Sequence, residues 1–151
     1  MKFELITIGR LKKGAHLDLC NDYTNRLTTP VIIHEGESKI TTESAQKSDE
    51  EKYLLSKIPK DSYCFILDEH GKALKSLDFA KKLEDLNVQG HSHFAFIIGG
   101  ATGLGEQVKA RANFSLSFGL QTWPHQLVRV MLLEQLYRAQ QIRAGHPYHK
   151  E

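Results

Sequence analysis

Residues 93–105, His-Phe-Ala-Phe-Ile-Ile-Gly-Gly-Ala-Thr-Gly-Leu-Gly, join the most apolar run of this 151-residue chain to a loop with four glycines. The run 93–98 is short, uninterrupted and rich in aromatic and β-branched residues, a pattern typical of a strand buried on both faces. Such strands belong to parallel sheets whose faces are covered by helices. This stretch therefore predicts an α/β fold.

Periodicity on either side of this stretch supports the same fold. Short apolar runs alternate with helical patterns along the whole chain, which favours parallel strands joined by helical crossovers. We expect a mostly parallel sheet of five to six strands, flanked by helices. The expected strands are 3–8, 31–34, 63–67, 93–98 and 114–118, and the expected helices are 16–27, 41–58, 77–86, 106–112 and 127–144.

Two of these helices carry local capping patterns. Ser48 and Glu51 have the spacing of a capping box, just before the apolar residues that start at Tyr53. Ser76 is a candidate N-cap for the helix whose apolar face lies in 77–86.

The overall composition is that of an ordinary globular domain, with 40% hydrophobic and 25% charged residues. No apolar run approaches the length of a membrane span, and the N-terminus lacks the basic and apolar regions of a signal peptide. Cys20 and Cys64 are isolated, which favours buried thiols over a disulfide or a zinc site. We therefore expect one cytoplasmic domain over residues 1–151, with no membrane contact.

Positive charge is concentrated in the C-terminal third. The net charge is only +2, but residues 99–151 carry six Lys or Arg against three Asp or Glu. This excess of positive charge is consistent with an anionic partner and equally with an ordinary solvated surface. The pairs His91/His93 and His146/His149 lack a supporting Cys, Asp or Glu, so we expect no metal site.

Three polar or glycine-bearing loops follow expected strands, at 67–71, 99–105 and 119–124. In open α/β sheets, ligands bind beyond the carboxyl ends of the strands, so these loops mark the expected binding site. The glycine loop is either a nucleotide or cofactor cradle or a tight turn. It lacks the phosphate-binding pattern G-x-x-x-x-G-K-[ST]. It also lacks G-x-G-x-x-G, and no acidic residue between Glu106 and Glu134 is available to hold a ribose.

The expected last helix, 127–144, is apolar on almost every side in its first half. Such a helix is buried all round, and in so small a domain we expect Val128, Leu132 and their neighbours to meet a second subunit. Arg129 interrupts the apolar run, either as a paired structural cation or as a functional cation near a substrate. The tail 146–151 is either a disordered end or a set of RNA contacts made by ring stacking and phosphate attraction.

Five blocks of residues make the chain resemble a known family. They are FIIGGATGL at 96–104, SLS at 115–117, PHQLVRV at 124–130, EQLYRA at 134–139 and HPYH at 146–149. In this order they are similar to the family of ribosomal RNA large subunit methyltransferase H, a member of the SPOUT class of knotted methyltransferases. The resemblance covers the whole chain and is densest over 94–151. One departure is Ala101-Thr102, where family members often have Pro-Glu or Ser-Asn.

The resemblance implies an enzyme that uses S-adenosylmethionine, without a metal, in a single SPOUT-type domain over 1–151. It implies an obligate homodimer and a deep trefoil knot in the C-terminal half, which the sequence pattern alone does not predict. The implied substrate is pseudouridine 1915 of 23S ribosomal RNA, the large-subunit RNA, methylated at N3 on the assembled ribosome.

The cofactor contacts that the resemblance implies fall on the three loops already singled out by their position after strands. Trp123 either contacts the cofactor directly or wedges its loop against the core. The implied cofactor-binding residues are Leu67, Gly99, Gly100, Phe118, Gly119, Leu120, Gln121, Thr122 and Trp123.

Methyl transfer to N3 of a pseudouridine requires removal of a proton or stabilisation of an anion. The polar groups available are His125, Arg129, Tyr148 and His149. We expect Arg129 to orient the substrate or stabilise the anion, and the other three are further candidates, with no general base identified. Two alternatives stay open: a non-catalytic ribosome-binding or assembly protein, and a transfer RNA methyltransferase of the same knotted class.

Overall fold

The apolar run 93–98 forms β4 (His93–Ile98), the central strand of a five-stranded sheet. The strand order is β2-β1-β4-β3-β5 and every neighbouring pair is parallel, so the predicted α/β fold is confirmed with five strands. The structure, a computed structural model, describes residues 1–150. The other strands are β1 (Lys2–Ile8), β2 (Val31–Gly36), β3 (Tyr63–Ala73) and β5 (Phe114–Ser117).

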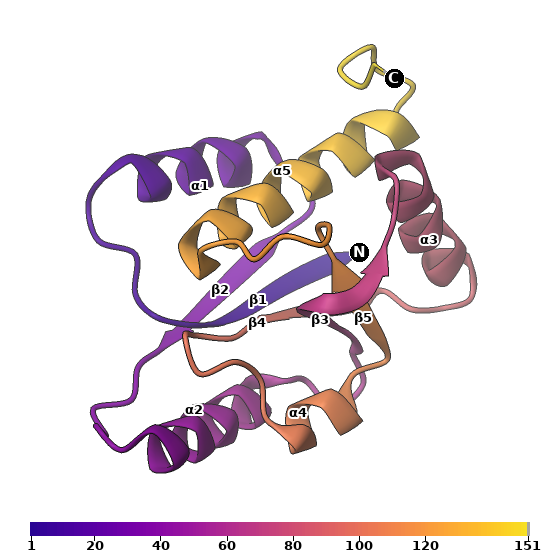
Figure 1. The fold of residues 1–151 in the computed structure, drawn as a ribbon. Helices are drawn as coiled ribbons and strands as arrows, with labels where there is room; N and C mark the ends of the chain where they lie inside the picture. Colours follow the sequence, from indigo (N-terminus) through magenta and orange to yellow (C-terminus); the bar gives the residue numbers. More distant parts are fainter. Residues whose placement is uncertain (151) are drawn as a thin grey trace.

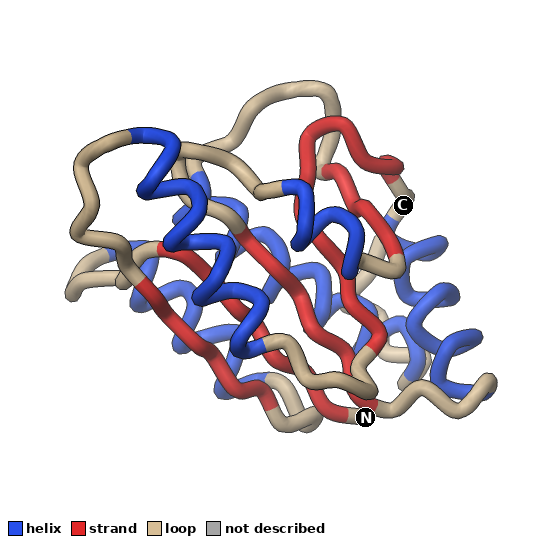
Figure 2. The backbone as a smooth tube through the Cα atoms, turned by 90° about the horizontal axis from the view of Figure 1, so that it is seen from below, coloured by secondary structure: helices blue, strands red, loops and turns tan. Residues whose placement is uncertain are grey.

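Helices cover both faces of the sheet, as a parallel sheet requires. In Figure 1 the long C-terminal helix lies with two others above the sheet, and two helices lie below it. Figure 2, seen from below, places the lower pair in front of the strands. The upper layer is α1 (Ala15–Arg26), α3 (Ser76–Val88) and α5 (His125–Arg143), and the lower layer is α2 (Glu43–Lys57) and α4 (Glu106–Arg111).

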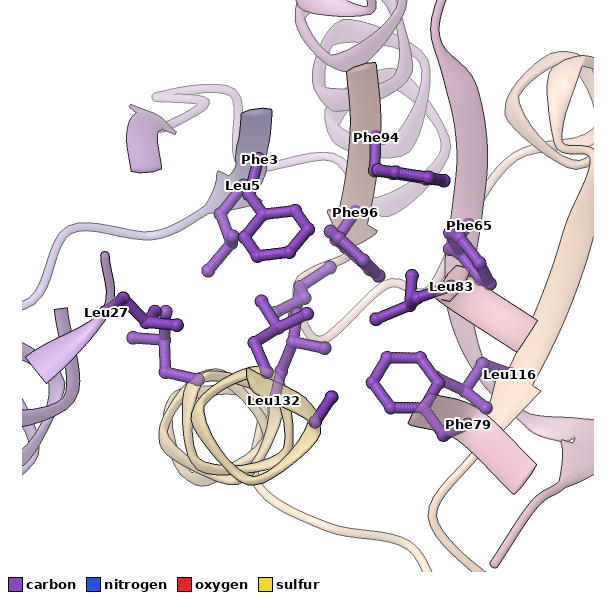
Figure 3. Close-up of a cluster of buried hydrophobic side chains, with 14 of the residues drawn as sticks. Phe3, Leu5, Leu27, Phe65, Phe79, Leu83, Phe94, Phe96, Leu116 and Leu132 are labelled. Atoms are coloured by element: carbon purple, nitrogen blue, oxygen red, sulfur yellow. The ribbon is translucent and has the colours of Figure 1, made fainter. Parts of the chain in front are cut away.

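The larger core lies between the sheet and the upper helices and is rich in phenylalanine (Figure 3). Phe65 of β3 and Phe96 of β4 stack with ring centroids 4.9 Å apart. Leu132 of α5 is fully buried in the same cluster, so the chain's own sheet and helices cover it. The expectation that Leu132 needs a second subunit for burial is therefore wrong, whereas Val128 is only half-buried.

Two predicted capping roles are wrong, because tertiary contacts use the polar side chains differently. Helix α2 begins at Glu43, after Thr42, so Ser48 and Glu51 lie inside the helix and form no capping box. Helix α3 begins at Ser76 itself, whose hydroxyl donates a hydrogen bond to Gln135 Oε1 of α5 at 2.7 Å.

Strand β3 extends beyond the expected end at Asp68, because the chain leaves the sheet and returns to it. Leu67 and Lys72 both pair with Leu116 of β5, so residues 68–71 protrude. Gly71 permits the close return, since a Cβ there would lie 2.7 Å from the Ser115 backbone. The protrusion places a polar loop at the carboxyl edge of the sheet.

Both cysteines are free and buried, as predicted. Burial raises the pKa of the Cys64 thiol to about 11, which leaves it protonated and unreactive at neutral pH. None of the helices within residues 1–150 is both long and apolar enough to cross a membrane.

Candidate functional site

Three loops at the carboxyl edge of the sheet surround one cavity of about 380 Å³. The loops follow the first half of β3, the end of β4 and the end of β5, the positions where parallel α/β sheets bind ligands. The floor is apolar and comes from Leu67, Ile98, Leu116, Phe118 and Val128. The volume is within the range of small-molecule sites, which is about 300–1,000 Å³.

The first wall is the protrusion of β3, and it is tied to the loop after β5. Ser117 Oγ lies 3.2 Å from the Glu69 carbonyl oxygen and accepts a hydrogen bond from the Gly119 N–H at 3.1 Å. The Thr122 hydroxyl donates to the Glu69 carboxylate. These contacts hold two loops together that are about fifty residues apart in the sequence.

The second wall is the glycine loop, and a buried carboxylate from α2 supports it. Glu50 is 4% exposed and accepts a hydrogen bond from the Thr102 hydroxyl at 2.7 Å. Gly100 lies against β1, because a Cβ there would be 2.9 Å from Ile8 Cγ2. The departure from the family pattern at Thr102 thus has a specific partner in this chain.

Glu51, the next residue of α2, secures the far end of the same loop. Its Oε2 accepts hydrogen bonds from the backbone N–H groups of Gln107 and Val108, at 3.0 and 3.2 Å. These are first-turn donors of α4, which have no partner within the helix. Glu51 therefore caps α4 from a distance, and sequence spacing within its own helix gave no sign of this role.

The third wall is the loop from Phe118 to Trp123. The Trp123 indole N–H donates to the Phe118 carbonyl at 3.2 Å and so closes the loop on itself. Trp123 lines the cavity and is 38% exposed. Leu120 is 99% exposed and does not line the cavity.

His125 is the one predicted catalytic residue that lines the cavity. It opens α5 and is half-buried. A Cβ on Gly9 would lie 3.4 Å from His125 Nε2, so the end of β1 packs directly against this ring. Gly9 has a φ of 98°, a conformation that favours glycine.

Arg129 is buried beneath the site, with 2% of its surface exposed. Its Nη1 donates to Glu35 Oε2 at 2.6 Å, and its Nη2 donates to Thr7 Oγ1 at 2.8 Å and to the Gly9 carbonyl at 3.0 Å. Both terminal nitrogens are thus engaged by the protein. Of the two interpretations left open by the sequence, this geometry favours the paired structural cation.

Residues 146–150 of the tail fold back on the second half of α5 and do not line the cavity. The Tyr148 hydroxyl donates to Glu134 Oε1 at 3.1 Å, and His149 Nδ1 lies 3.1 Å from Arg138 Nη1. Burial raises the pKa of Tyr148 to about 12, and the Glu134 carboxylate adds to the shift. Tyr148 is therefore a neutral hydrogen-bond donor at physiological pH.

The structure thus brings most of the predicted cofactor residues together and separates the predicted catalytic ones. Lys47 and Lys109 also line the cavity, from α2 and α4. Sequence reasoning missed both, because nothing distinguishes them from other surface lysines. The predicted residues that line the cavity are Leu67, Gly99, Gly100, Phe118, Gly119, Gln121, Thr122, Trp123 and His125.

The cavity can accept an organic ligand with a planar apolar part and several polar groups. Apolar side chains form its floor, while Asp68 and Glu69 offer carboxylates at the rim. Within residues 1–150, the backbone N–H groups of Gly99 and Gly100 have no protein acceptor. In the same range, no group of three or more His, Cys, Asp or Glu is arranged to hold a metal ion.

Known sequences match this chain along its whole length. The family profile described as "Predicted SPOUT methyltransferase" matches residues 1–149. The ribosomal RNA large subunit methyltransferase H of Rhodospirillum centenum is 44% identical over 151 residues, and that of Clostridium acetobutylicum is 43% identical over 159. Each alignment covers 99% of this chain and at least 99% of the relative.

Solved structures with little sequence identity share the fold. A probable methylase family protein from Haemophilus influenzae has a TM-score of 0.59 at 10% identity, over 99% of this chain and 70% of that one. A putative methyltransferase from Legionella pneumophila, solved with bound S-adenosylmethionine, has a TM-score of 0.51 at 14% identity, over 92% and 66%. By its full-length sequence matches, this chain belongs to the SPOUT methyltransferase family, among the ribosomal RNA large subunit methyltransferases H.

Proposed function

We propose that this protein transfers a methyl group from S-adenosylmethionine to N3 of a pseudouridine in large-subunit ribosomal RNA. The relatives named as ribosomal RNA large subunit methyltransferases support the reaction and the class of RNA. The observation that carries the proposal is the convergence of three strand-end loops on one cavity at the carboxyl edge of the sheet.

The residues of the cavity fit this cofactor. Apolar side chains such as Leu67 and Leu116 suit an adenine ring, and the rim carboxylates Asp68 and Glu69 suit ribose hydroxyls and an amino group. The unpaired N–H groups of Gly99 and Gly100 suit ring nitrogens or a carboxylate. When bound, S-adenosylmethionine supplies an electrophilic methyl group on a sulfonium.

Of the four candidate catalytic residues, His125 is the one that lines the cavity, which supports a role beside the target base. We propose that His125 orients the base and holds the N3 proton by a hydrogen bond. Arg129 then acts from below, by fixing the end of β1 against which His125 packs. Tyr148 and His149 are proposed to bind RNA, from a tail that contacts Glu134 and Arg138.

We further propose a homodimer of single-domain subunits in the cytoplasm. A second hollow of about 530 Å³ lies between α5 and α3, and the apolar side chains of Phe118, Val130 and Met131 line it. A second copy that covers this hollow would remove the apolar surface from water. Light scattering at low micromolar concentration should give twice the chain mass. The trefoil knot stays a prediction from the family.

The reaction is tested with labelled S-adenosylmethionine and ribosomes from a strain that lacks this gene. We expect label in large-subunit RNA, at N3 of one pseudouridine. Intact ribosomes that stay unlabelled would leave the non-catalytic ribosome-binding alternative. Label that enters transfer RNA in a parallel reaction, and not ribosomes, would establish the other alternative. Free RNA, the large subunit and the whole ribosome should be compared as substrates.

Trp123 offers a direct test of the cofactor site, because it is the only tryptophan in the chain. A ligand in the cavity changes the surroundings of its indole, so S-adenosylmethionine should shift the emission saturably. Gly100→Val should abolish the shift, since a side chain there collides with Ile8. Binding by calorimetry with unchanged emission would remove the loop 118–123 from the site.

A further inference from the structure

A basic loop follows β1 at the same edge of the sheet as the cavity. Residues 9–14 read Gly-Arg-Leu-Lys-Lys-Gly, and Arg10, Lys12 and Lys13 are all exposed. Within residues 1–150, none of these three cations has a carboxylate at ion-pair distance. Arg10 acts on the Glu35 carboxylate only at longer range, where its charge helps to lower the Glu35 pKa, so none of the three cations is held in a direct ion pair.

The backbone of the loop is held firmly, which is unusual for a purely solvated turn. The Gly9 N–H donates to the Gly36 carbonyl at 2.7 Å, and the Leu11 N–H donates to Glu35 Oε2 at 2.8 Å. The Gly9 carbonyl accepts from buried Arg129 at 3.0 Å. The buried, paired cation Arg129 and two hydrogen bonds donated by backbone N–H groups thus fix the start of the basic loop.

The loop is anchored to the wall of the cavity itself. Gly9 packs against His125, which lines the cavity, and Arg129 lies one helical turn further along α5. In Figure 1 the segment between β1 and α1 passes beside the start of α5. The loop that carries the exposed cations therefore begins beside a residue of the cavity wall.

We propose that Arg10, Lys12 and Lys13 bind backbone phosphates of the RNA strand that carries the target base. The inference rests on the proposed function for the class of partner. A nucleotide in the cavity brings its flanking phosphates to the rim, where fixed cations gain affinity by releasing counterions. Contacts of this kind position the strand without reading its sequence.

The test is the double variant Lys12→Gln/Lys13→Gln, with Lys2→Gln/Lys60→Gln as the matched control. Both variants lose two exposed positive charges. Lys2 and Lys60 precede or begin β1 and β3, at the opposite edge of the parallel sheet. Binding to unmethylated ribosomes is measured against salt concentration, without methyl transfer, and calorimetry gives the affinity for S-adenosylmethionine.

The loop variant should bind ribosomes on the order of tenfold more weakly, with the slope of log K against log salt reduced by about 1–2. Its cofactor affinity should match that of the parent, and the control should keep the parent slope. An unchanged slope in the loop variant, or an equal loss in the control, would overturn the inference. Because binding is read alone, a parent that binds through this loop yet transfers no methyl group would refute only the proposed function.

Discussion

Replacing Arg129 by methionine should lower the free energy of unfolding by about 3–5 kcal/mol, the usual cost of removing one partner of a buried ion pair. The Arg129 side chain is 3% exposed, and Glu35 is 28% exposed. Methionine fills much of the same volume but leaves Glu35 without its cation and the Gly9 carbonyl without its donor. Chemical denaturation of parent and variant gives the difference directly.

The double variant Arg129→Met/Glu35→Gln separates the ion pair from simple packing. The introduced amide would keep an acceptor for the Leu11 N–H while removing the unpaired charge, so part of the lost stability should return. If Arg129→Met alone costs less than about 1 kcal/mol, the network is not structural. Arg129 would then return as a candidate for direct contact with the substrate.

The same pair predicts how stability depends on pH. Burial alone would raise the pKa of Glu35, but hydrogen bonds from Arg129 and Leu11 and the positive charge of Arg129 outweigh it and lower the pKa below 4.5. Because the pKa of Glu35 is lower in the folded state than in the unfolded state, its ionised carboxylate stabilises the fold at pH values above the unfolded-state pKa. This stabilisation is lost as the pH falls through the folded-state pKa. The stability gap between parent and Glu35→Gln should therefore be full at neutral pH and shrink below about 4.5.

Sequence periodicity located the elements well, because burial in a parallel sheet requires nearly continuous apolar runs. The run 93–98 is found as β4 with the same bounds, and the three loops that follow strands meet at one cavity. That meeting follows from topology alone, since the carboxyl ends of parallel strands share one edge.

What the sequence could not reveal depends on contacts between distant residues. Glu51 has the spacing of a local cap but instead caps α4, about fifty-six residues further along the chain. The sequence leaves two interpretations of Arg129 open, and the contacts with Glu35 and Thr7 favour the paired structural cation. The return of β3 after residues 68–71 depends on its pairing with Leu116, which no local pattern encodes.

Deleting residues 146–151 should leave folding and cofactor binding nearly unchanged while methyl transfer falls by more than about 100-fold, as expected when a substrate is misplaced. Residues 146–150 pack on α5, where Tyr148 contacts Tyr137 and Arg138. None of these five residues lines the cavity. We therefore propose that the tail acts on RNA that extends beyond the cavity, or at the cavity of a second copy.

His149 provides the sharpest point variant within the tail. A guanidinium only donates hydrogen bonds, so His149 Nδ1 must accept from Arg138, and in the neutral ring Nε2 then carries the proton. Within residues 1–150 this buried Nε2 has no partner. An unpaired buried donor is costly, so we expect RNA that displaces the tail from α5 to take up this N–H.

We therefore expect His149→Ala to lose most of the activity and His149→Gln, which keeps an N–H donor at a similar reach, to recover part of it. Tyr148→Phe separates the ring from the hydroxyl of this second proposed RNA contact, because it keeps the ring on Tyr137 and removes only the hydroxyl bound to Glu134. Thermal unfolding and cofactor affinity should stay at the parent values in all three variants. A truncated protein that unfolds or fails to bind S-adenosylmethionine would show that the tail is structural, and equal activity of the alanine and parent proteins would remove His149 from the site.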